Sequence, residues 1–546
     1  MKNQAVPTPR LFRKFFGYGL LSGALATGVA FLGTRLLGLP YPPEAIFQAL
    51  IAPVPGSIQS FIVESFGQYA KYSTFVFAMA VYGLSYGFVA VLAGYVFHFD
   101  LRNRGRHILV LATVVPTVVG IAFEGLLSSR ASALSSLSGW LVAGVFILAV
   151  NLSYAALLVH QAAPLSRAAV IEPTGAATEI TRLPPSSRRT FLKRLVIGAA
   201  ALVLAVVAAS QGIRIFSGQP VVRSNSPIPI NSGPSEIEVG GLPPIFLDER
   251  IRDLVASEIT DNRIFYRVDI DPIPPSLSFD TWSLKVGGKV NKPLVLNKDS
   301  LMRLPKKEQY ATLECVSNTI NPPAALIGNA KWTGVGLAAL LNEAVVSPDA
   351  KYVVFRCADG YSVGIPLDRA MQPGAMLAYM MDDQLLPTEH GFPLRVIVPG
   401  IYGMMNAKWI TEIEVVDHVY LGYWQERGWS NDAKIKTTSI IYYPADAAEI
   451  NGITPIAGVA FAGDRGISKV EVSVDGGNTW SEAALKKPVS PYSWVLWAYK
   501  WTPTSKGAYT ILARAYDGTG KIQDAKISPP FPDGASGYHR IQVTAT

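Results

Sequence analysis

Hydrophobic residues are unevenly distributed along the chain, and most of the apolar sequence precedes residue 217. A helix needs about 20 apolar residues to cross roughly 30 Å of hydrocarbon. Five stretches meet this requirement, near residues 16–38, 72–98, 107–127, 137–160 and 195–216. A less apolar stretch at 44–66 is interrupted by Pro53 and Pro55, so we interpret it as re-entrant or interfacial. The pattern predicts an N-terminal all-α transmembrane bundle over residues 1–217.

Basic residues beside these stretches predict the orientation of the bundle. They gather before the first span, between the second and third, and between the fourth and fifth, and the positive-inside rule places such loops in the cytoplasm. The N-terminus is then cytoplasmic and everything after residue 217 is extracytoplasmic, as in a multi-pass protein of the cell membrane. The clusters are Arg10, Arg13 and Lys14, then Arg102, Arg104 and Arg106, then Arg167, Arg182, Arg188, Arg189, Lys193 and Arg194.

The segment Ser187-Arg-Arg-Thr-Phe-Leu-Lys193 also resembles a twin-arginine export signal, because the residues around the arginine pair match as well. Such signals serve proteins that fold around a cofactor before they are exported. An ordinary basic flank of a membrane span is the alternative interpretation.

Two regions of different composition follow the last apolar stretch, and they cover residues 218–432. Residues 218–245 are rich in Pro, Ser, Gly and Asn, which indicates a linker without a core. Residues 246–432 mix short helical and strand-like segments, which predicts an α+β domain. Strands are expected at Thr281–Val286, Tyr352–Arg356, Leu394–Val398 and Ile410–Val416.

Residues 433–546 consist of short alternating runs separated by Gly, Asp and Asn turns. This spacing predicts an immunoglobulin-like β-sandwich of about a hundred residues. The turn at 474–478, Val-Asp-Gly-Gly-Asn, is typical of a hairpin. The expected strands are Ile456–Phe461, Lys469–Val474, Val495–Trp501 and Tyr509–Tyr516.

The net charge and the cysteine count exclude several classes of function. The chain carries a net charge of +8, but no basic stripe with interleaved aromatic residues, so nucleic acid is not an expected partner. Two cysteines, Cys315 and Cys357, are too few for an iron–sulfur cluster or a disulfide scaffold. Cys315 is therefore either a soft ligand for a heavy metal or a structural residue, in the core or in a disulfide with Cys357.

Five motifs occur in order between residues 312 and 480, and together they resemble the sulfite-oxidase superfamily of molybdopterin enzymes. The resemblance covers roughly residues 246–546, and it includes the β-sandwich that often mediates dimerisation in this superfamily. The motifs are Thr312-Leu-Glu-Cys315-Val-Ser-Asn318, Gly328-Asn-Ala-Lys-Trp332-Thr-Gly334, Pro387-Thr-Glu-His390-Gly-Phe-Pro-Leu-Arg395-Val-Ile-Val-Pro-Gly400, Ala407-Lys408-Trp409 and Val472-Ser-Val-Asp-Gly-Gly-Asn-Thr-Trp480.

The resemblance implies a molybdenum-molybdopterin cofactor with Cys315 as the protein ligand of the metal, and Cys357 as an inert core thiol. A thiolate suits a redox-active metal, and Arg395 and Lys408 suit a phosphate. His390 is expected to donate a hydrogen bond to the phosphate or the pterin. The resemblance implies cofactor binding by Tyr266, Arg267, Asp359, His390, Arg395, Asn406 and Lys408.

The chain departs from sulfite oxidases where those enzymes bind their anion. Thr319 and Ile320 stand where two arginines usually follow the cysteine, Trp429 stands at the position of a tyrosine, and Val495 at that of a further arginine. Either Arg267 or Val268 occupies the place of the remaining arginine. Sulfite would therefore bind weakly.

We expect a membrane-anchored oxidoreductase that transfers an oxygen atom to or from a small substrate other than sulfite, such as a sulfoxide, with Cys315, Arg267 and Trp429 at the catalytic site. The lipid bilayer, an electron-transfer protein or a quinone, and a second copy of the chain are the expected partners. The alternative is a non-catalytic surface protein that keeps the fold for binding.

Overall fold

The computed structural model describes residues 9–37, 47, 54, 58, 69–96, 107–114, 116–118, 147–152, 154–156, 158–159, 242–271 and 274–546. The predicted span at 195–216, the twin-arginine-like segment and nearly all of the predicted linker lie outside these residues. The chain divides into two compact units, one of Met1–Pro53 with Lys71–Gly218 and one of Val54–Ala70 with Gln219–Thr546.

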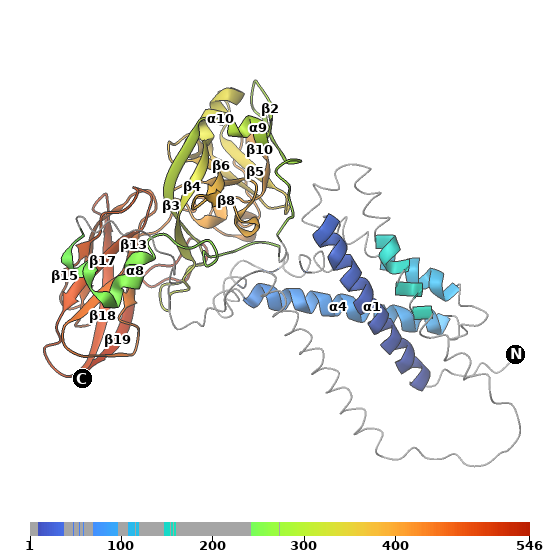
Figure 1. Cartoon of the computed structure of the whole chain (residues 1–546), viewed down its shortest axis with the longest axis horizontal. Helices are drawn as coiled ribbons and strands as arrows, with labels where there is room; N and C mark the ends of the chain where they lie inside the picture. Colours follow the sequence, from blue (N-terminus) through green and yellow to red (C-terminus); the bar gives the residue numbers. More distant parts are fainter. Residues whose placement is uncertain are drawn as a thin grey trace, which may run out of the picture. The chain divides into compact units, whose positions relative to one another are not determined.

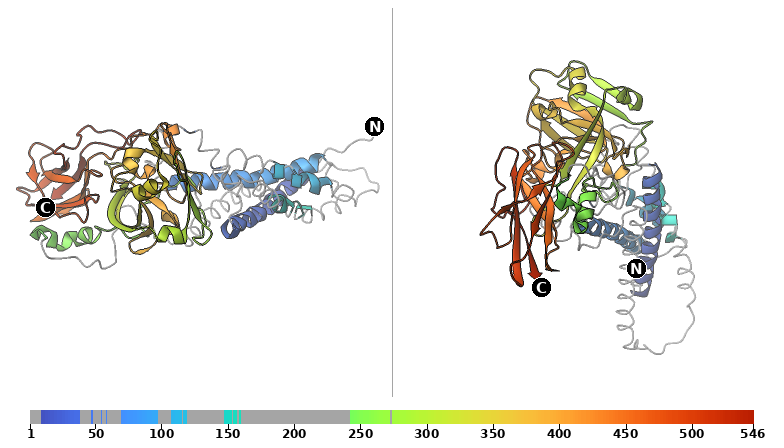
Figure 2. Two further views of the ribbon diagram at one scale, coloured as in Figure 1. Left: turned by 90° about the horizontal axis from the view of Figure 1, so that it is seen from above. Right: turned by 60° about the vertical axis from the view of Figure 1, so that its left-hand side comes forward.

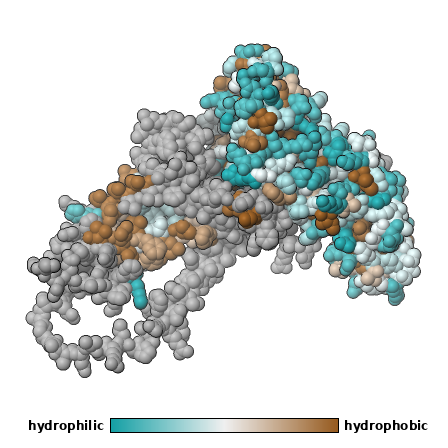
Figure 3. Space-filling view, turned by 180° about the vertical axis from the view of Figure 1, so that it is seen from behind, coloured by the Kyte–Doolittle hydropathy of each residue, from teal (hydrophilic) through white to brown (hydrophobic). Residues whose placement is uncertain are grey.

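The described part of the first unit is helical. Helix α1 runs over Pro9–Leu37 and helix α4 over Tyr69–Val96, where two of the apolar spans are predicted (Figure 1). Among the described residues one stretch, Val76–Ala93 in α4, is long and apolar enough to cross a membrane. In the space-filling view, hydrophobic residues gather over these helices (Figure 3). The five-span bundle as a whole stays a prediction.

Small residues and a polar contact hold the helices of the first unit together. A Cβ at Gly19 would lie 2.6 Å from the Cβ of Ala90, and one at Gly23 would lie 2.5 Å from the Cβ of Tyr86, so glycine permits the close approach of α1 and α4. Tyr86 also donates a hydrogen bond of 2.8 Å to the side chain of Asn151.

The first half of the second unit contains one mixed sheet and one antiparallel sheet. The first has the strand order β2-β1-β10-β5-β6, and only its β1–β10 pair is parallel. The second has the order β3-β4-β7-β8, with β9 added to β7. The strands are β1 (Ser283–Gly288), β2 (Leu294–Asn297), β3 (Lys306–Glu314), β4 (Ile327–Gly336), β5 (Tyr352–Cys357), β6 (Ser362–Pro366), β7 (Met376–Met381), β8 (Gln384–Leu385), β9 (Arg395–Ile397) and β10 (Ile410–Val416).

Short helices connect several of these strands. Helix α9 begins with a capping box in which Asn297 accepts from the backbone N–H of Ser300 at 2.9 Å. Helix α10 ends at Val345, which adopts a left-handed conformation with φ +56°. The helices are α8 (Arg252–Ala256), α9 (Lys298–Met302), α10 (Leu337–Ala344) and α11 (Leu367–Ala370), with the 3₁₀ turns η1 (Pro244–Leu247), η2 (Glu249–Ile251), η3 (Thr388–His390), η4 (Gly403–Met405) and η5 (Gln425–Arg427).

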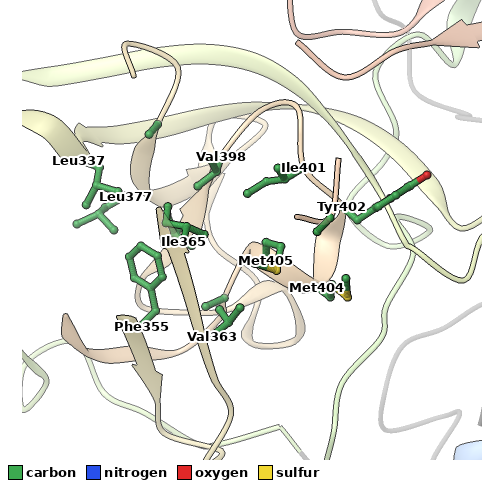
Figure 4. Packing of buried hydrophobic residues seen from close by; sticks show 14 of the residues in the cluster. Leu337, Phe355, Val363, Ile365, Leu377, Val398, Ile401, Tyr402, Met404 and Met405 are labelled. Carbon is green, nitrogen blue, oxygen red and sulfur yellow. The ribbon is translucent and has the colours of Figure 1, made fainter. Parts of the chain in front are cut away.

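One apolar core joins the two sheets and the loop that follows β9. Phe355 of β5 and Leu377 of β7 are fully buried in it. Met404 and Met405 of η4 belong to the same core, near Ile401 (Figure 4). The core therefore fixes η4, which carries part of the site described below.

The C-terminal half of the second unit consists of two sheets, β11-β13-β17-β16 and β12-β19-β18-β14-β15. A shared core that includes Trp497, Ile511 and Val543 packs them against one another. Alternate residues of β19 are buried and exposed, as expected for a strand with one wet face. The strands are β11 (Thr438–Tyr443), β12 (Ala448–Ile450), β13 (Thr454–Phe461), β14 (Ile467–Ser473), β15 (Ser481–Glu482), β16 (Ala484–Leu485), β17 (Val495–Trp501), β18 (Gly507–Asp517) and β19 (His539–Ala545).

The two β-rich halves of the second unit lie side by side (Figure 2) and share buried contacts. The backbone N–H of Trp494, beside β17, donates to the hydroxyl of Thr312 in β3 at 2.9 Å. Arg369 of α11 forms an ion pair of 2.6 Å with Asp464. These contacts fix the sandwich against β3, the strand that leads to Cys315.

All eight strands expected in the second unit are present, and β10 and β17 have the predicted bounds. The hairpin turn predicted at 474–478 connects β14 to β15, which pair antiparallel. The long antiparallel pair of β3 and β4 is not among the expected strands, although it carries two of the five motifs.

Candidate functional site

Cys315 follows the last residue of β3 and begins a tight loop. Its backbone N–H donates to the carbonyl of Leu326 at 2.9 Å, and its Sγ lies 3.0 Å from the hydroxyl of Ser317. The side chain is buried, and burial raises the pKa of the thiol. Cys315 and Cys357 are both free, so the structure does not support the disulfide alternative.

Cys315 lines a cavity with about 980 Å³ of empty space, counting the open solvent at its mouth. All but one of the predicted site residues line this cavity, and the exception is Arg267. Those that line it are Cys315, Tyr266, Asp359, His390, Arg395, Asn406, Lys408 and Trp429.

Arg395, the first residue of β9, is a buried cation without a carboxylate partner among the described residues. Its guanidinium donates to the carbonyls of His390 at 3.0 Å and Asn406 at 3.3 Å, and it lies 4.9 Å from the centre of the Trp332 ring. Its Nε is buried and has no hydrogen-bond partner. Burial lowers the pKa of Arg395 to about 10, so it stays charged at neutral pH. A buried cation of this kind requires an anion.

His390 ends η3 and is buried beside Arg395. Burial lowers its pKa to about 3, and the positive charges of Arg395 and Arg267 act in the same direction. Its Nε2 lies 2.7 Å from the carbonyl oxygen of Asn262, which can only accept, so Nε2 carries the proton of the neutral ring. Nδ1 is left as an acceptor. The neutral ring therefore offers the cavity an acceptor at Nδ1, in place of the hydrogen-bond donor expected from the sequence.

Asp269 organises the two other cations of the predicted site. Lys408 pairs with one of its carboxylate oxygens and donates to the carbonyl of Glu389 at 3.1 Å. Arg267 lies 3.4 Å from the other oxygen and is not among the residues that line the cavity. Val268 does line it. The catalytic and cofactor-binding roles predicted for Arg267 stay predictions.

Asn406 and Tyr266 contribute to the cavity in different ways. The Asn406 side chain accepts from the backbone N–H of Val398 at 2.7 Å and donates to the carbonyl of Tyr402 at 3.1 Å, so it mainly holds the loop between them. Tyr266 stacks on Phe265 with 5.4 Å between ring centres, and burial raises the pKa of its hydroxyl. Asp359 is buried and accepts from the backbone N–H of Tyr361 at 3.0 Å.

Two glycines permit the close packing of side chains that line the cavity. Gly391 has a φ of +113°, and a Cβ there would lie 3.0 Å from the Cβ of Lys408 and 3.1 Å from that of Arg395. A Cβ at Gly403 would lie 2.3 Å from the hydroxyl of Tyr266. Any side chain at these positions would displace residues that line the cavity.

Sequence reasoning does not identify Asp269 or Trp332 as part of the site. Asp269 is an acidic residue close to Arg267 in the sequence, but its pairing with Lys408 across 139 positions becomes visible only in the fold. Trp332 belongs to the second motif, and its contact with Arg395 explains in physical terms how that motif contributes to the site.

The residues around the cavity fit a molybdopterin cofactor. The cavity offers one thiol and a buried guanidinium whose Nε has no hydrogen-bond partner. An anionic group such as a phosphate would supply the acceptor that Arg395 lacks. Cys315 would hold the metal, and Arg395 with Lys408 would hold the phosphate.

Comparison with known proteins supports a molybdenum-molybdopterin cofactor. Residues 271–424 match the family model of the oxidoreductase molybdopterin binding domain, and residues 430–545 match that of the Mo-co oxidoreductase dimerisation domain. The second half of the chain thus carries the domains of sulfite-oxidase-type molybdopterin oxidoreductases, whose cofactor is molybdenum-molybdopterin. Tyr266 and Arg267 precede the first match, and Trp429 falls between the two.

Among curated relatives, mitochondrial sulfite oxidase of Rattus norvegicus is 30% identical over 374 residues, which are 59% of this chain and 66% of that protein. The NADH nitrate reductase of Solanum lycopersicum is 26% identical over 344 residues, which are 50% of this chain and 38% of that protein. This chain thus spans just under two thirds of the rat enzyme. The solved structure of the sulfane dehydrogenase SoxCD of Paracoccus pantotrophus is 23% identical, with a TM-score of 0.45 over 52% of this chain and 83% of that one.

Proposed function

We propose that this chain is a membrane-anchored molybdenum-molybdopterin oxidoreductase that transfers an oxygen atom to or from a small substrate other than sulfite. The observation that carries the proposal is the meeting of the Cys315 thiol and the unpaired Arg395 guanidinium in one cavity. The cofactor, when bound, supplies the two-electron oxidation or reduction that oxygen-atom transfer requires.

The residues of the chain hold and orient the cofactor. The thiolate of Cys315 ligates the metal, since a soft anionic sulfur suits it. Arg395 donates to the phosphate, and a charge-assisted hydrogen bond of this kind contributes about 1.5–3 kcal/mol. Lys408 adds a second positive charge. His390, which burial keeps neutral, would accept a hydrogen bond from the cofactor at Nδ1, because Nε2 donates to the carbonyl of Asn262.

Sulfite is a poor substrate because the side of the cavity near Cys315 lacks an available cation. Ile320 and Val495 are buried in the apolar core, and the Thr319 hydroxyl donates to the carbonyl of Pro322 at 2.6 Å. Among the described residues that line the cavity, the cationic side chains are Arg395 and Lys408, and both are assigned to the cofactor. Each missing charge-assisted contact would cost about 1.5–3 kcal/mol of sulfite binding.

The anchor and the side of the membrane are part of the same proposal. The apolar stretch of α4 supports the anchor, and the arrangement of Lys and Arg supports an extracytoplasmic catalytic half. The twin-arginine-like segment at 187–193 agrees with export of a folded, cofactor-loaded half. A C-terminal alkaline phosphatase fusion should be active in cells, whereas an inactive fusion would contradict the proposed orientation.

The proposed partners are a redox partner and a second copy of the chain. Either an electron-transfer protein or a quinone would exchange electrons with the cofactor. The match of residues 430–545 to a dimerisation domain supports a homodimer. A non-catalytic binding role is not favoured, because it gives no reason for an unpaired buried guanidinium beside a free thiol.

A substrate screen tests the proposal directly. The full chain is purified from a host that makes the molybdenum cofactor and is assayed with sulfite and an electron acceptor, and separately with sulfoxides and a reduced electron donor. We expect turnover of a sulfoxide or related oxide and at least tenfold lower kcat/KM for sulfite. Loaded enzyme that prefers sulfite would contradict the proposed substrate class, and loaded enzyme without turnover would contradict the proposed activity.

A further inference from the structure

Trp429 presents a polar group whose partner is missing. Its side chain is 6% exposed and lines the same cavity as Cys315. Its indole Nε1 is buried and has no hydrogen-bond partner among the described residues. An indole N–H can only donate, so the missing partner is an acceptor. Buried donors are nearly always satisfied in native proteins, and an exception at a cavity indicates a ligand.

The backbone holds the Trp429 ring in place. The residue follows η5 and Gly428, whose φ of +91° turns the chain, and its own N–H donates to the carbonyl of Trp424 at 3.1 Å. Phe531 packs edge-to-face on the ring, with 5.2 Å between centres and 79° between planes. The indole therefore has little freedom to seek a partner elsewhere.

Two arginines that do not line the cavity are engaged by other groups. The Arg427 guanidinium lies 3.6 Å from the centre of the Tyr423 ring and donates to the Tyr423 carbonyl at 2.6 Å. Arg267 pairs with Asp269. The cavity lining also includes apolar side chains such as Val268, Val316 and Met404. Trp429 thus offers an uncharged donor, whereas the cations of the lining, Arg395 and Lys408, are assigned to the cofactor.

We propose that the indole N–H of Trp429 donates a hydrogen bond to the oxygen of an uncharged substrate in which that oxygen is bonded to sulfur or nitrogen. This inference rests on the proposed function and names its substrate class. In the reaction the S–O or N–O bond breaks, and the substrate takes up two electrons and two protons to give the sulfide or amine and water. The electrons come from an external one-electron donor through the cofactor.

The experiment uses cofactor-loaded full chain and the variants Trp429→Phe and Trp497→Phe. Phenylalanine keeps an aromatic ring but removes the N–H, and Trp497, in the core of the sandwich, also has a buried Nε1 without a partner but does not line the cavity. With reduced viologen as donor, Trp429→Phe should raise KM for dimethyl sulfoxide and trimethylamine N-oxide about tenfold, which corresponds to about 1.4 kcal/mol. Its unfolding midpoint should be unchanged or higher, because an unsatisfied donor is removed. Trp497→Phe should change KM less than twofold.

Two results would overturn the inference. A Trp429→Phe variant with a lower unfolding midpoint and an unchanged KM would show that the N–H rests on the face of Phe531 and is structural. A loaded wild type that turns over only anions would exclude a neutral substrate. A wild type that contains no molybdenum or turns over nothing would overturn the proposed function together with this inference, so the two failures are distinguishable.

Discussion

The two β-rich halves of the second unit differ in how many of their buried polar side-chain atoms lack a hydrogen-bond partner. Thirteen buried side-chain atoms among the described residues have no hydrogen-bond partner, and eleven of them lie before residue 432. The two in the sandwich belong to Ser439 and Trp497. In the sandwich, Arg465 and Asp517 pair at 2.9 Å, and Arg514 and Glu471 at 2.7 Å. The catalytic half instead leaves the Nε of Arg395 and the Nε1 of Trp429 without a partner at its cavity.

This difference indicates what each half is built for. A domain that serves as a scaffold pairs its buried charges, because an unpaired one lowers stability. A domain that binds an anionic cofactor leaves donors for it and accepts the loss of stability until the cofactor arrives. The comparison therefore predicts opposite outcomes for similar substitutions in the two halves.

The largest expected effect follows from Cys315→Ser. Residues that merely orient a metal ligand typically cost about 10–100-fold in activity when changed, so loss of the ligand itself should cost more than about 100-fold. Cys357→Ser is the matched control, because Cys357 is also buried and free but belongs to the apolar core. It should lower the unfolding midpoint and leave turnover per bound molybdenum within about twofold. Equal turnover losses in both variants would contradict the role of Cys315.

An intermediate effect separates two arginines. Arg395→Met removes a cation without a carboxylate partner, so the cofactor-free chain should unfold at the same or a higher denaturant concentration. The affinity of the same variant for the cofactor should fall by about tenfold or more, because one charge-assisted hydrogen bond contributes about 1.5–3 kcal/mol. Arg465→Met leaves Asp517 buried without its cation and should lower the free energy of unfolding by about 2 kcal/mol. Destabilisation by Arg395→Met of the same size would remove the contrast between the halves.

A further prediction is a pH dependence confined to the sandwich. Burial lowers the pKa of His539 to about 4, and its Nδ1 accepts from the backbone N–H of Ile441 at 3.0 Å. Because the unfolded chain binds the proton near pH 6.5, this contribution is complete above that pH and is lost progressively toward pH 4, to a total of about 3 kcal/mol. His539→Asn keeps an acceptor and removes the titration.

Denaturant unfolding of wild type and His539→Asn at pH 7.5 and pH 5 measures this contribution. The variant should lose less stability on acidification than the wild type does. Identical losses in the two proteins would show that His539 does not titrate between these values.

The strands of the second unit are largely predictable from the sequence, because alternation and turn residues act locally. β10 and β17 illustrate this, with predicted and observed bounds that coincide. The pair β3–β4 is harder, because both faces of these strands are partly buried and the pattern does not alternate.

The candidate site is predictable only as far as the motifs reach. They identify Cys315, His390, Arg395 and Lys408, which line one cavity. The partner of each side chain depends on the fold, as the pairing of Asp269 with Lys408 and the contact of Asn262 with His390 show. The protonated nitrogen of His390 and the unpaired N–H of Trp429 are properties of those contacts, so no pattern in the sequence reveals them.

The central claim is that the cavity beside Cys315 and Arg395 holds molybdenum-molybdopterin. The most direct test is to measure molybdenum and pterin in full-length protein purified from a host that makes the cofactor. The account predicts close to one molybdenum and one pterin per chain in the wild type, and a loss of metal in Cys315→Ser with the fold retained. Wild-type protein that is folded but contains neither molybdenum nor pterin would contradict it.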